Sequence, residues 1–291
     1  HLIFDGWSFG ILLKELAFFY GKFTETDPGE TPGRQLPGLP IQYFDYAQWQ
    51  RERLARNDLA DQGEYWKRQL SGLESLHLPI DKRRPAIQTF NGSKIIVGIP
   101  AHLSDSLLRL AQSEGVTLYM LLLAAFDTLL YRYTGQEDLA VGALAANRNL
   151  GVLELLIGFF ANSLVLRTAL SGDIGFRELL SRVKKTTLEA YANQDFPFEK
   201  IVEELHPERD LSQNPLFQVL FGMQNIPNLS PSFAELDVRQ VEIHNDFARF
   251  DLAVDLWETA PGLTAVFEYN SDLILPDTVS RMAGHYQRLL E

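Results

Sequence analysis

The sequence predicts an α/β protein built around a mixed sheet, and three observations lead to this class. Segments with the two-residue apolar period of strands alternate with segments of helical period over most of the chain. The 291 residues are 46% hydrophobic, 11% aromatic and 22% charged, which is typical of a globular protein that buries a core. No repeat with a period of about 20–50 residues is visible, which argues against solenoids and propellers.

The first part of the chain predicts a short strand followed by helices. Residues 1–4 are apolar and predict a strand, Asp5 and Gly6 predict a tight turn, and residues 8–20 place their apolar side chains on one helical face. Residues 24–40 contain four Pro and predict a loop. Residues 41–70 are rich in Arg, Glu, Gln and aromatic side chains, and they predict two helical segments.

The rest of the chain supplies most of the predicted sheet. Periodicity and turn residues there predict the following elements in order. Strands are expected at 94–99, 139–144, 163–169, 216–223, near 235–243, 250–257 and 263–269, and helices at 104–113, 117–133, 176–193, 198–205 and 277–290.

Residues 76–92 have no apolar period and predict a linker between two lobes. The segment holds two prolines and the basic run Lys82, Arg83 and Arg84. We therefore expect lobes at residues 1–75 and 93–291. The chain opens inside an apolar run, with no Met and no leader-like segment, so we expect the neighbours of its first strand to lie upstream.

Charge and composition argue against several classes of function. The 38 acidic and 26 basic residues give a net charge of −12, which repels nucleic acid and anionic lipid surfaces. There is no Cys, which excludes disulfides, cysteine nucleophiles and thiolate metal sites. The longest apolar run, residues 118–126, is shorter than the roughly 20 residues that cross a bilayer. We expect a cytoplasmic protein with no nucleic-acid or membrane partner.

The string His1-x-x-x-Asp5-Gly6 is the first candidate for chemistry. An imidazole at a strand end can present one nitrogen to a substrate, while an Asp in the following turn can fix the backbone through an ion pair or hydrogen bonds. Alone, the string is more typical of a strand-end His with a helix-capping Asp than of a catalytic site. The other five His residues are too scattered to suggest a metal site.

Four further segments follow His1 in a fixed order, at residues 43–49, 157–167, 193–199 and 209–217. Each is ordinary by itself. In this order, after the His1 string, they make the sequence resemble the condensation domains of nonribosomal peptide synthetases, relatives of chloramphenicol acetyltransferase. The resemblance covers nearly the whole chain. It implies the two-lobed chloramphenicol acetyltransferase-like α/β fold with mixed sheets, the first lobe being incomplete.

The resemblance also assigns lobes and residues. Residues 1–75 correspond to the remainder of the donor-side lobe, 76–92 to the interlobe linker and 93–291 to the acceptor-side lobe. His1 corresponds to the catalytic histidine, and an Arg-rich motif upstream of the chain is the expected partner region of Asp5. Asp5, Gly6, Trp7 and Ser8 are expected to shape the active site, and the motif residues expected near the tunnel or lobe interface are Tyr43, Asp45, Trp49, Arg148, Asn162, Gln194, Asp195, Arg209, Asp210 and Asn214.

The implied reaction is peptide-bond formation. The amine of a carrier-bound acceptor attacks a carrier-bound aminoacyl or peptidyl thioester, with both substrates held on phosphopantetheine arms. The implied partners are donor and acceptor peptidyl carrier domains and the adenylation domain of the same synthetase, with no cofactor or metal bound directly. An α-amine has a pKa of about 8, so His1 needs to position the amine and handle its proton more than to deprotonate it fully. We expect the 291-residue chain alone to be a poor catalyst.

The motifs of this chain differ from those of several related classes, and one alternative function stays open. His1 argues against heterocyclisation domains, which carry Asp there, and Trp7 to Leu12 resembles peptide-bond-forming members more than epimerisation domains. We find no Asp-Phe-Gly-Trp-Gly string of the plant-type acyltransferases. The alternative is an inactive condensation-like platform that recruits carrier domains or tailoring enzymes. The residue that precedes His1 in the parent protein would help to separate the two.

Overall fold

The computed structural model describes residues 3–24, 36–207, 210–224, 233, 236–238, 241, 246–259 and 262–291. The chain divides into two compact units. Unit 1 comprises His1–Ala60, Ala146–Asn162 and Ile226–His244. Unit 2 comprises Asp61–Ala145, Ser163–Asn225 and Asn245–Glu291.

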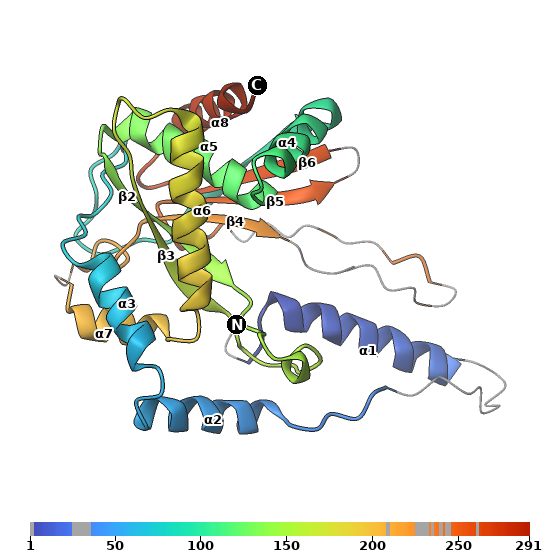
Figure 1. Ribbon diagram of the computed structural model, residues 1–291. Helices are drawn as coiled ribbons and strands as arrows, with labels where there is room; N and C mark the ends of the chain where they lie inside the picture. Colours follow the sequence, from blue (N-terminus) through green and yellow to red (C-terminus); the bar gives the residue numbers. More distant parts are fainter. Residues whose placement is uncertain are drawn as a thin grey trace. The chain divides into compact units, whose positions relative to one another are not determined.

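A six-stranded sheet forms the centre of unit 2 (Figure 1). Its strand order is β1-β6-β5-β4-β2-β3. β2, β4 and β5 pair in parallel, whereas β5, β6 and β1 pair antiparallel, which confirms the predicted mixed α/β class. The strands are β1 (Gly92–Pro100), β2 (Asp138–Ala145), β3 (Asn162–Ala169), β4 (Val219–Gln224), β5 (Leu252–Thr259) and β6 (Gly262–Asn270).

Helices of unit 2 pack against this sheet and bury its core. α4 and α8 contact β1 and β6, while α5 contacts β2 and β4. The ring of Phe126 in α5 stacks on that of Phe221 in β4 at 4.9 Å, and Tyr286 of α8 meets Phe126 edge-on. The helices are α3 (Ala60–Leu70), α4 (Ala101–Ser113), α5 (Leu118–Thr134), α6 (Phe176–Ala192), α7 (Phe198–Leu205) and α8 (Pro276–Leu290).

α5 has the local signals that begin and end a helix. Thr117 accepts a hydrogen bond from the Met120 N–H at its N-terminus. Gly135 ends it with φ +70°, a left-handed conformation that glycine adopts without strain. Every residue from Met120 to Asp127 is buried, as expected for a helix at the centre of a core.

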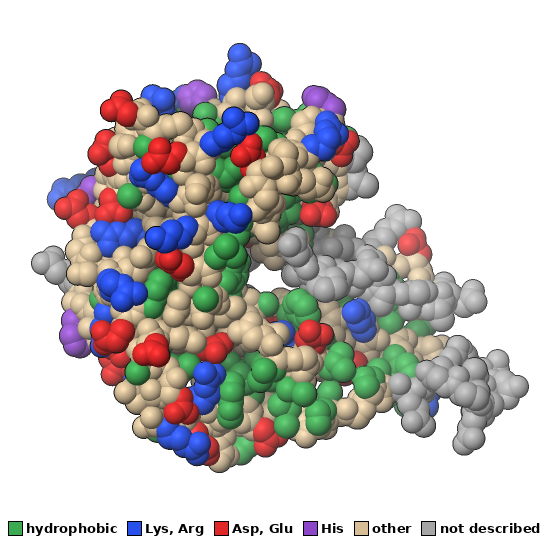
Figure 2. All heavy atoms as spheres, in the orientation of Figure 1, with side chains coloured by type: hydrophobic (Ala, Val, Ile, Leu, Met, Phe, Trp, Pro, Cys, Tyr) green, Lys and Arg blue, Asp and Glu red, His purple; other side chains and the backbone are tan. Residues whose placement is uncertain are grey.

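Among the described residues, unit 1 contains two helices, the loop segment 146–162 and a few residues of 226–244. The helices are α1 (Gly6–Thr24) and α2 (Tyr43–Ala55), and the loop segment includes the 3-10 turn η1 (Gly151–Leu153). The apolar cluster of this unit is small, and it contains Tyr46, Leu153, Leu156 and Phe160. Figure 2 shows apolar side chains at the surface of the molecule. Along α1 the exposed large apolar side chains are Phe9, Leu12, Leu16, Phe19 and Phe23.

Most predicted elements agree with the structure within a few residues, but one does not. Ile3 and Phe4 were expected in a strand and have no strand conformation, because no described strand pairs with them. His1 and Leu2 lie outside the described residues, as does most of the strand predicted near 235–243. Residues 76–92 and α3 from Asp61 onward belong to unit 2, whereas residues 146–162 belong to unit 1. The lobe boundaries of the intact domain stay a prediction.

No single described helix is long and apolar enough to cross a membrane. α4 and α5 meet the length and composition test only as a pair, with a bend of 104° between them.

Candidate functional site

The candidate site begins at the N-terminus of α1, where Asp5 caps the helix. Its Oδ1 accepts a hydrogen bond from the Ser8 backbone N–H at 2.9 Å, and its carbonyl accepts one from Phe9 at 3.2 Å. Asp is a favoured N-cap because its carboxylate satisfies a free N–H and lies at the positive end of the helix dipole. The local sequence Asp5-Gly6-Trp7-Ser8 therefore sets where the helix starts.

The same carboxylate ties α1 to residues 158–160, about 150 positions along the chain. Phe160 N–H donates to Asp5 Oδ2 at 3.0 Å, and Asp5 N–H donates to the Gly158 carbonyl at 3.2 Å. The Ser8 hydroxyl lies 2.8 Å from both Asp5 Oδ1 and the Gly158 carbonyl, and it accepts from Gly158 N–H at 3.0 Å. The helix start and the distant loop are thus held by one hydrogen-bond network.

Arg148 provides the positive charge of this network. Its Nη2 lies 3.1 Å from Asp5 Oδ1 and 2.7 Å from the Ser8 hydroxyl. Its Nη1 donates to the carbonyls of Leu153 and Leu156. The side chains of Arg148 and Asp5 are only 2% and 6% exposed, so this ion pair is buried. A buried pair tolerates desolvation only with such additional hydrogen bonds.

The network keeps Asp5 ionised. Burial alone would raise the pKa of its carboxyl, but the donors from Ser8, Phe160 and Arg148 outweigh burial and lower that pKa below its ordinary value. Burial in turn lowers the pKa of the Arg148 guanidinium, which nonetheless stays charged because its ordinary pKa is so high. Asp5 is therefore a fixed structural anion rather than a proton carrier.

Aromatic rings pack around the ion pair. The Arg148 guanidinium lies 4.1 Å from the Phe160 ring centroid, a cation–π contact, and Phe160 packs against the ring of Tyr46 at 4.7 Å. The Tyr43 hydroxyl donates to the Phe159 carbonyl at 2.9 Å. A Cβ added to Gly158 would lie 2.1 Å from the Tyr43 ring, so only glycine fits there.

Two local features prepare the segment that carries Arg148. Asn147 adopts φ +52°, a left-handed conformation that Asn tolerates better than most residues, and its amide donates to the Tyr46 hydroxyl at 3.3 Å. Trp7 donates from its indole N–H to the Glu154 carbonyl at 3.0 Å. Arg148 is thus presented by a turn that is itself tied to α1 and α2.

The structure corrects the predicted partner of Asp5. We expected the partner in an Arg-rich region upstream, whereas the ion pair forms with Arg148 inside the chain. The site residues predicted from the sequence include Arg148 as a motif residue only, and they do not include Gly158 and Phe160. Gly158 and Phe160 lie in the Ile-Gly-Phe-Phe string at residues 157–160, which is part of one of the motif segments that follow His1. They bind Asp5 through their backbone groups, and such contacts cannot be predicted from the type of side chain.

The other predicted site residues of unit 1 have structural partners. Asp45 accepts from the Gln42 N–H at 2.8 Å and caps α2. Trp49 lies under the guanidinium of Arg53, 4.7 Å from the ring centroid. Asn162 is buried at the first residue of β3. These residues belong to the same unit as Asp5 and Arg148.

A second group of predicted residues belongs to unit 2. The Gln194 amide donates to the Tyr191 carbonyl just past the end of α6, and Asp195 follows it. Asp210 accepts from the Ser212 N–H at 2.8 Å, and Asn214 donates to the Arg249 carbonyl at 2.9 Å. His1 and Arg209 lie outside the described residues. Within the described residues, no group of three or more His, Asp or Glu could hold a metal ion.

Comparison with known proteins defines the family of this chain. The model of the Condensation domain family matches residues 1–291, and the chain therefore belongs to that family. It is 48% identical over 293 residues to a linear gramicidin synthase protein of Brevibacillus parabrevis, and 41% identical over 292 residues to surfactin synthase subunit 1 of Bacillus subtilis. These matches cover 100% of this chain but only 4% and 8% of the two relatives, so the chain spans a small part of their length.

Solved structures have the same fold. The X-domain from teicoplanin biosynthesis matches with a TM-score of 0.82 and 29% identity over 99% of this chain and 66% of that one. A four-domain nonribosomal peptide synthetase bound to AMP and glycine matches with a TM-score of 0.86 and 24% identity, covering 99% of this chain and 22% of that one. The predicted chloramphenicol acetyltransferase-like fold is confirmed.

Proposed function

We propose that this chain is the catalytic-histidine-bearing part of a nonribosomal peptide synthetase condensation domain that forms peptide bonds. A carrier-bound acceptor amine attacks the carbonyl of a carrier-bound donor thioester. A C–N bond forms, the C–S bond breaks, the amine loses a proton and the departing thiolate gains one. The observation that carries the proposal is the intact His1-x-x-x-Asp5-Gly6 string in a chain that the condensation family matches from end to end.

The residues take different parts in this reaction. His1 positions the attacking amine and accepts its proton as the tetrahedral species forms. Asp5 does not exchange protons, because both of its oxygens accept hydrogen bonds and its pKa is lowered despite burial. Its role is to fix the start of α1, and with it the backbone that follows His1. Arg148 and Ser8 hold Asp5 in this role.

The proposed reaction requires partner domains of the same synthetase. Both substrates arrive on phosphopantetheine arms of donor and acceptor peptidyl carrier domains, and an adenylation domain of the same synthetase selects the amino acid. The curated relatives, which are far longer synthetase proteins, support this organisation. The protein works in the cytoplasm and binds no cofactor directly.

The test is His1→Ala in the intact synthetase module that contains this chain. Loss of the proton-handling group should reduce amide product at least about a hundredfold, whereas loading of the carrier domains stays unchanged. His102→Ala is the matched control, since His102 is exposed on α4 and lies outside the proposed site. Product from the His1 variant within a few-fold of the parent, with normal loading, would remove His1 from the chemistry.

One comparison favours a second candidate function, that of a recruiting platform. The X-domain from teicoplanin biosynthesis has the same fold, and it has also been solved in complex with OxyB, at 30% identity to this chain. A platform would tolerate loss of His1 without loss of product. The experiment above separates the two candidates, and the 48% identity to a linear gramicidin synthase protein supports the condensation reaction.

A further inference from the structure

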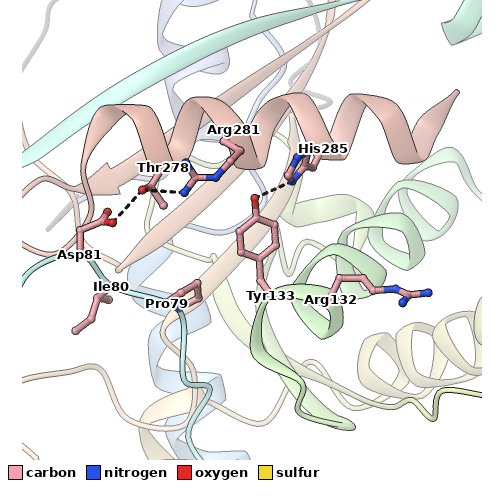
Figure 3. Close-up of a pocket in the computed structure, with 8 residues that line it drawn as sticks. All are labelled: Pro79, Ile80, Asp81, Arg132, Tyr133, Thr278, Arg281 and His285. Atoms are coloured by element: carbon pink, nitrogen blue, oxygen red, sulfur yellow. Dashed lines mark hydrogen bonds between the residues drawn. The ribbon is translucent and has the colours of Figure 1, made fainter.

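A groove on unit 2 lies outside the condensation chemistry described above. It has a volume of about 490 Å³ and is formed by residues 79–81, the last turn of α5 and one side of α8 (Figure 3). We call it the α5–α8 groove. Its lining residues are Pro79, Ile80, Asp81, Arg132, Tyr133, Thr278, Arg281 and His285.

Asp81 carries the one carboxylate among the described lining residues, and this carboxylate already accepts hydrogen bonds from α8. Asp81 Oδ2 accepts from the Leu275 N–H at 2.7 Å, and Asp81 Oδ1 accepts from the Thr278 hydroxyl at 3.0 Å. Both donors lie at the N-terminus of α8, where a carboxylate also compensates the helix dipole. Asp81 therefore stabilises the helix start, and it offers little to a cationic ligand.

The other polar groups of the groove are mainly donors. Arg281 donates one N–H to the Thr278 hydroxyl at 3.2 Å, and no hydrogen bond from its other four guanidinium N–H groups to a described residue is found. The Tyr133 hydroxyl lies 2.9 Å from Nδ1 of His285, so the second ring nitrogen stays available. Figure 3 shows Arg281 and His285 on α8, with Tyr133 reaching toward the histidine and Arg132 extending outward from α5.

The groove is therefore locally basic in a protein of net charge −12. Among the described lining residues, two guanidinium groups, Arg281 and the outward-extending Arg132 (Figure 3), accompany the carboxylate of Asp81, which already accepts two hydrogen bonds. A basic groove within an acidic protein concentrates small anions at that place.

We propose that the α5–α8 groove binds the phosphate group of a small ligand. The planar fork of a guanidinium matches two phosphate oxygens, and an imidazole beside it donates to a third. The volume lies within the range of roughly 300–1,000 Å³ that is typical of small-molecule sites, so the phosphate can be carried on a larger organic group. This inference does not rest on the proposed condensation activity.

The test measures binding to the 291-residue chain by titration calorimetry at constant ionic strength. The probes are inorganic phosphate, phosphopantetheine and pantetheine, the last being the matched ligand without phosphate. Arg281→Gln and His285→Gln should each weaken the Kd for phosphopantetheine about tenfold, since a hydrogen bond to a charged group is removed. Both residues are exposed, so the fold should stay intact, which circular dichroism checks.

Arg288→Gln is the control. Arg288 lies on the same helix and is exposed, but it pairs with Glu291 and is not part of the groove. The Kd of the Arg288→Gln variant for phosphopantetheine should equal that of the parent. Phosphopantetheine binding more tightly than inorganic phosphate would identify a carrier-type arm as the source, and equal binding would identify free phosphate. Pantetheine binding as tightly as phosphopantetheine, or equal losses in Arg288→Gln and Arg281→Gln, would overturn the proposal.

Discussion

Asp5 of unit 1 and Asp127 of unit 2 are both buried, but their carboxyl groups are held in opposite ways. Burial acts to raise the pKa of both, but in unit 1 Asp5 has hydrogen-bond donors for both oxygens, and its pKa is lowered. In unit 2 Asp127 is 1% exposed, and its Oδ2 has no hydrogen-bond partner among the described residues. Burial raises its pKa to about 7 against the opposing hydrogen bond of Thr168. Whether a buried carboxyl group stays charged therefore depends on the hydrogen-bond donors around it rather than on how deeply it is buried.

The two units also differ in what holds them together. Unit 2 buries the continuous apolar segment 120–126 of α5 against a six-stranded sheet. Unit 1 has a small aromatic cluster beside the Asp5–Arg148 pair, while α1 exposes a stripe of apolar side chains from Phe9 to Phe23. We infer that polar contacts carry a larger share of stability in unit 1 than in unit 2.

The largest effect is expected from Asp5→Ala. The substitution leaves Arg148 buried without its carboxylate, which should lower the free energy of unfolding of unit 1 by roughly 3–5 kcal/mol. Hydrogen exchange at the amides of Ser8 and Phe160, with urea unfolding, measures the loss. Adding Arg148→Met should recover part of it, because the unpaired charge is gone.

Asp45→Ala is the control for this comparison. Asp45 also accepts a backbone N–H at a helix start, but it is exposed and should cost only about 1 kcal/mol. Equal losses for the Asp5 and Asp45 variants would mean that burial of the ion pair adds nothing.

Asp127→Asn should act in the opposite direction. The pKa of Asp127 is about 7 in the folded protein against an ordinary 3.8, so its contribution to stability is greatest below about pH 4 and is lost as pH rises toward 7. The variant should remove this pH dependence and stabilise unit 2 at pH 8 by as much as roughly 4 kcal/mol. Urea unfolding at pH 5 and pH 8 measures it, with exposed Asp105→Asn as the control.

Asp5 gives the opposite pH dependence. Because its folded pKa is lowered, the stability it contributes is present above the ordinary pKa of 3.8 and is lost as pH falls further. The protection of unit 1 amides, corrected for the pH dependence of the intrinsic exchange rate, should therefore decrease in acid, while the contribution of Asp127 to the stability of unit 2 increases. A pH dependence of the same sign in both units would contradict the contrast.

A smaller effect is expected from Gly158→Ala. The added methyl group meets the Tyr43 ring, and the resulting displacement should cost roughly 1–3 kcal/mol in unit 1. Gly151→Ala, where no atom lies within 4 Å of the new Cβ, should be close to neutral. The urea midpoints of the Gly158→Ala and Gly151→Ala variants compare the two sites directly. Equal midpoints would show that the loop can move away from the Tyr43 ring without loss of stability.

The sequence predicted elements whose signals are local. The helix predicted at residues 117–133 is close to the observed α5, Leu118–Thr134. Thr117 and Gly135 are local signals for the two helix ends, and the long apolar segment between them contains no helix-breaking residue. The motif order placed the chain in its family and named Asp5, Ser8 and Arg148 as site residues.

Tertiary structure alone decided how these parts meet. Asp5 and Arg148 are 143 positions apart, and no local pattern states that one neutralises the other. The strand order β1-β6-β5-β4-β2-β3 and the grouping of residues 146–162 with α1 have the same origin. Helix signals act over one or two turns, whereas ion pairing and strand order depend on which distant segments can share a buried space, and that is settled only when the chain is packed.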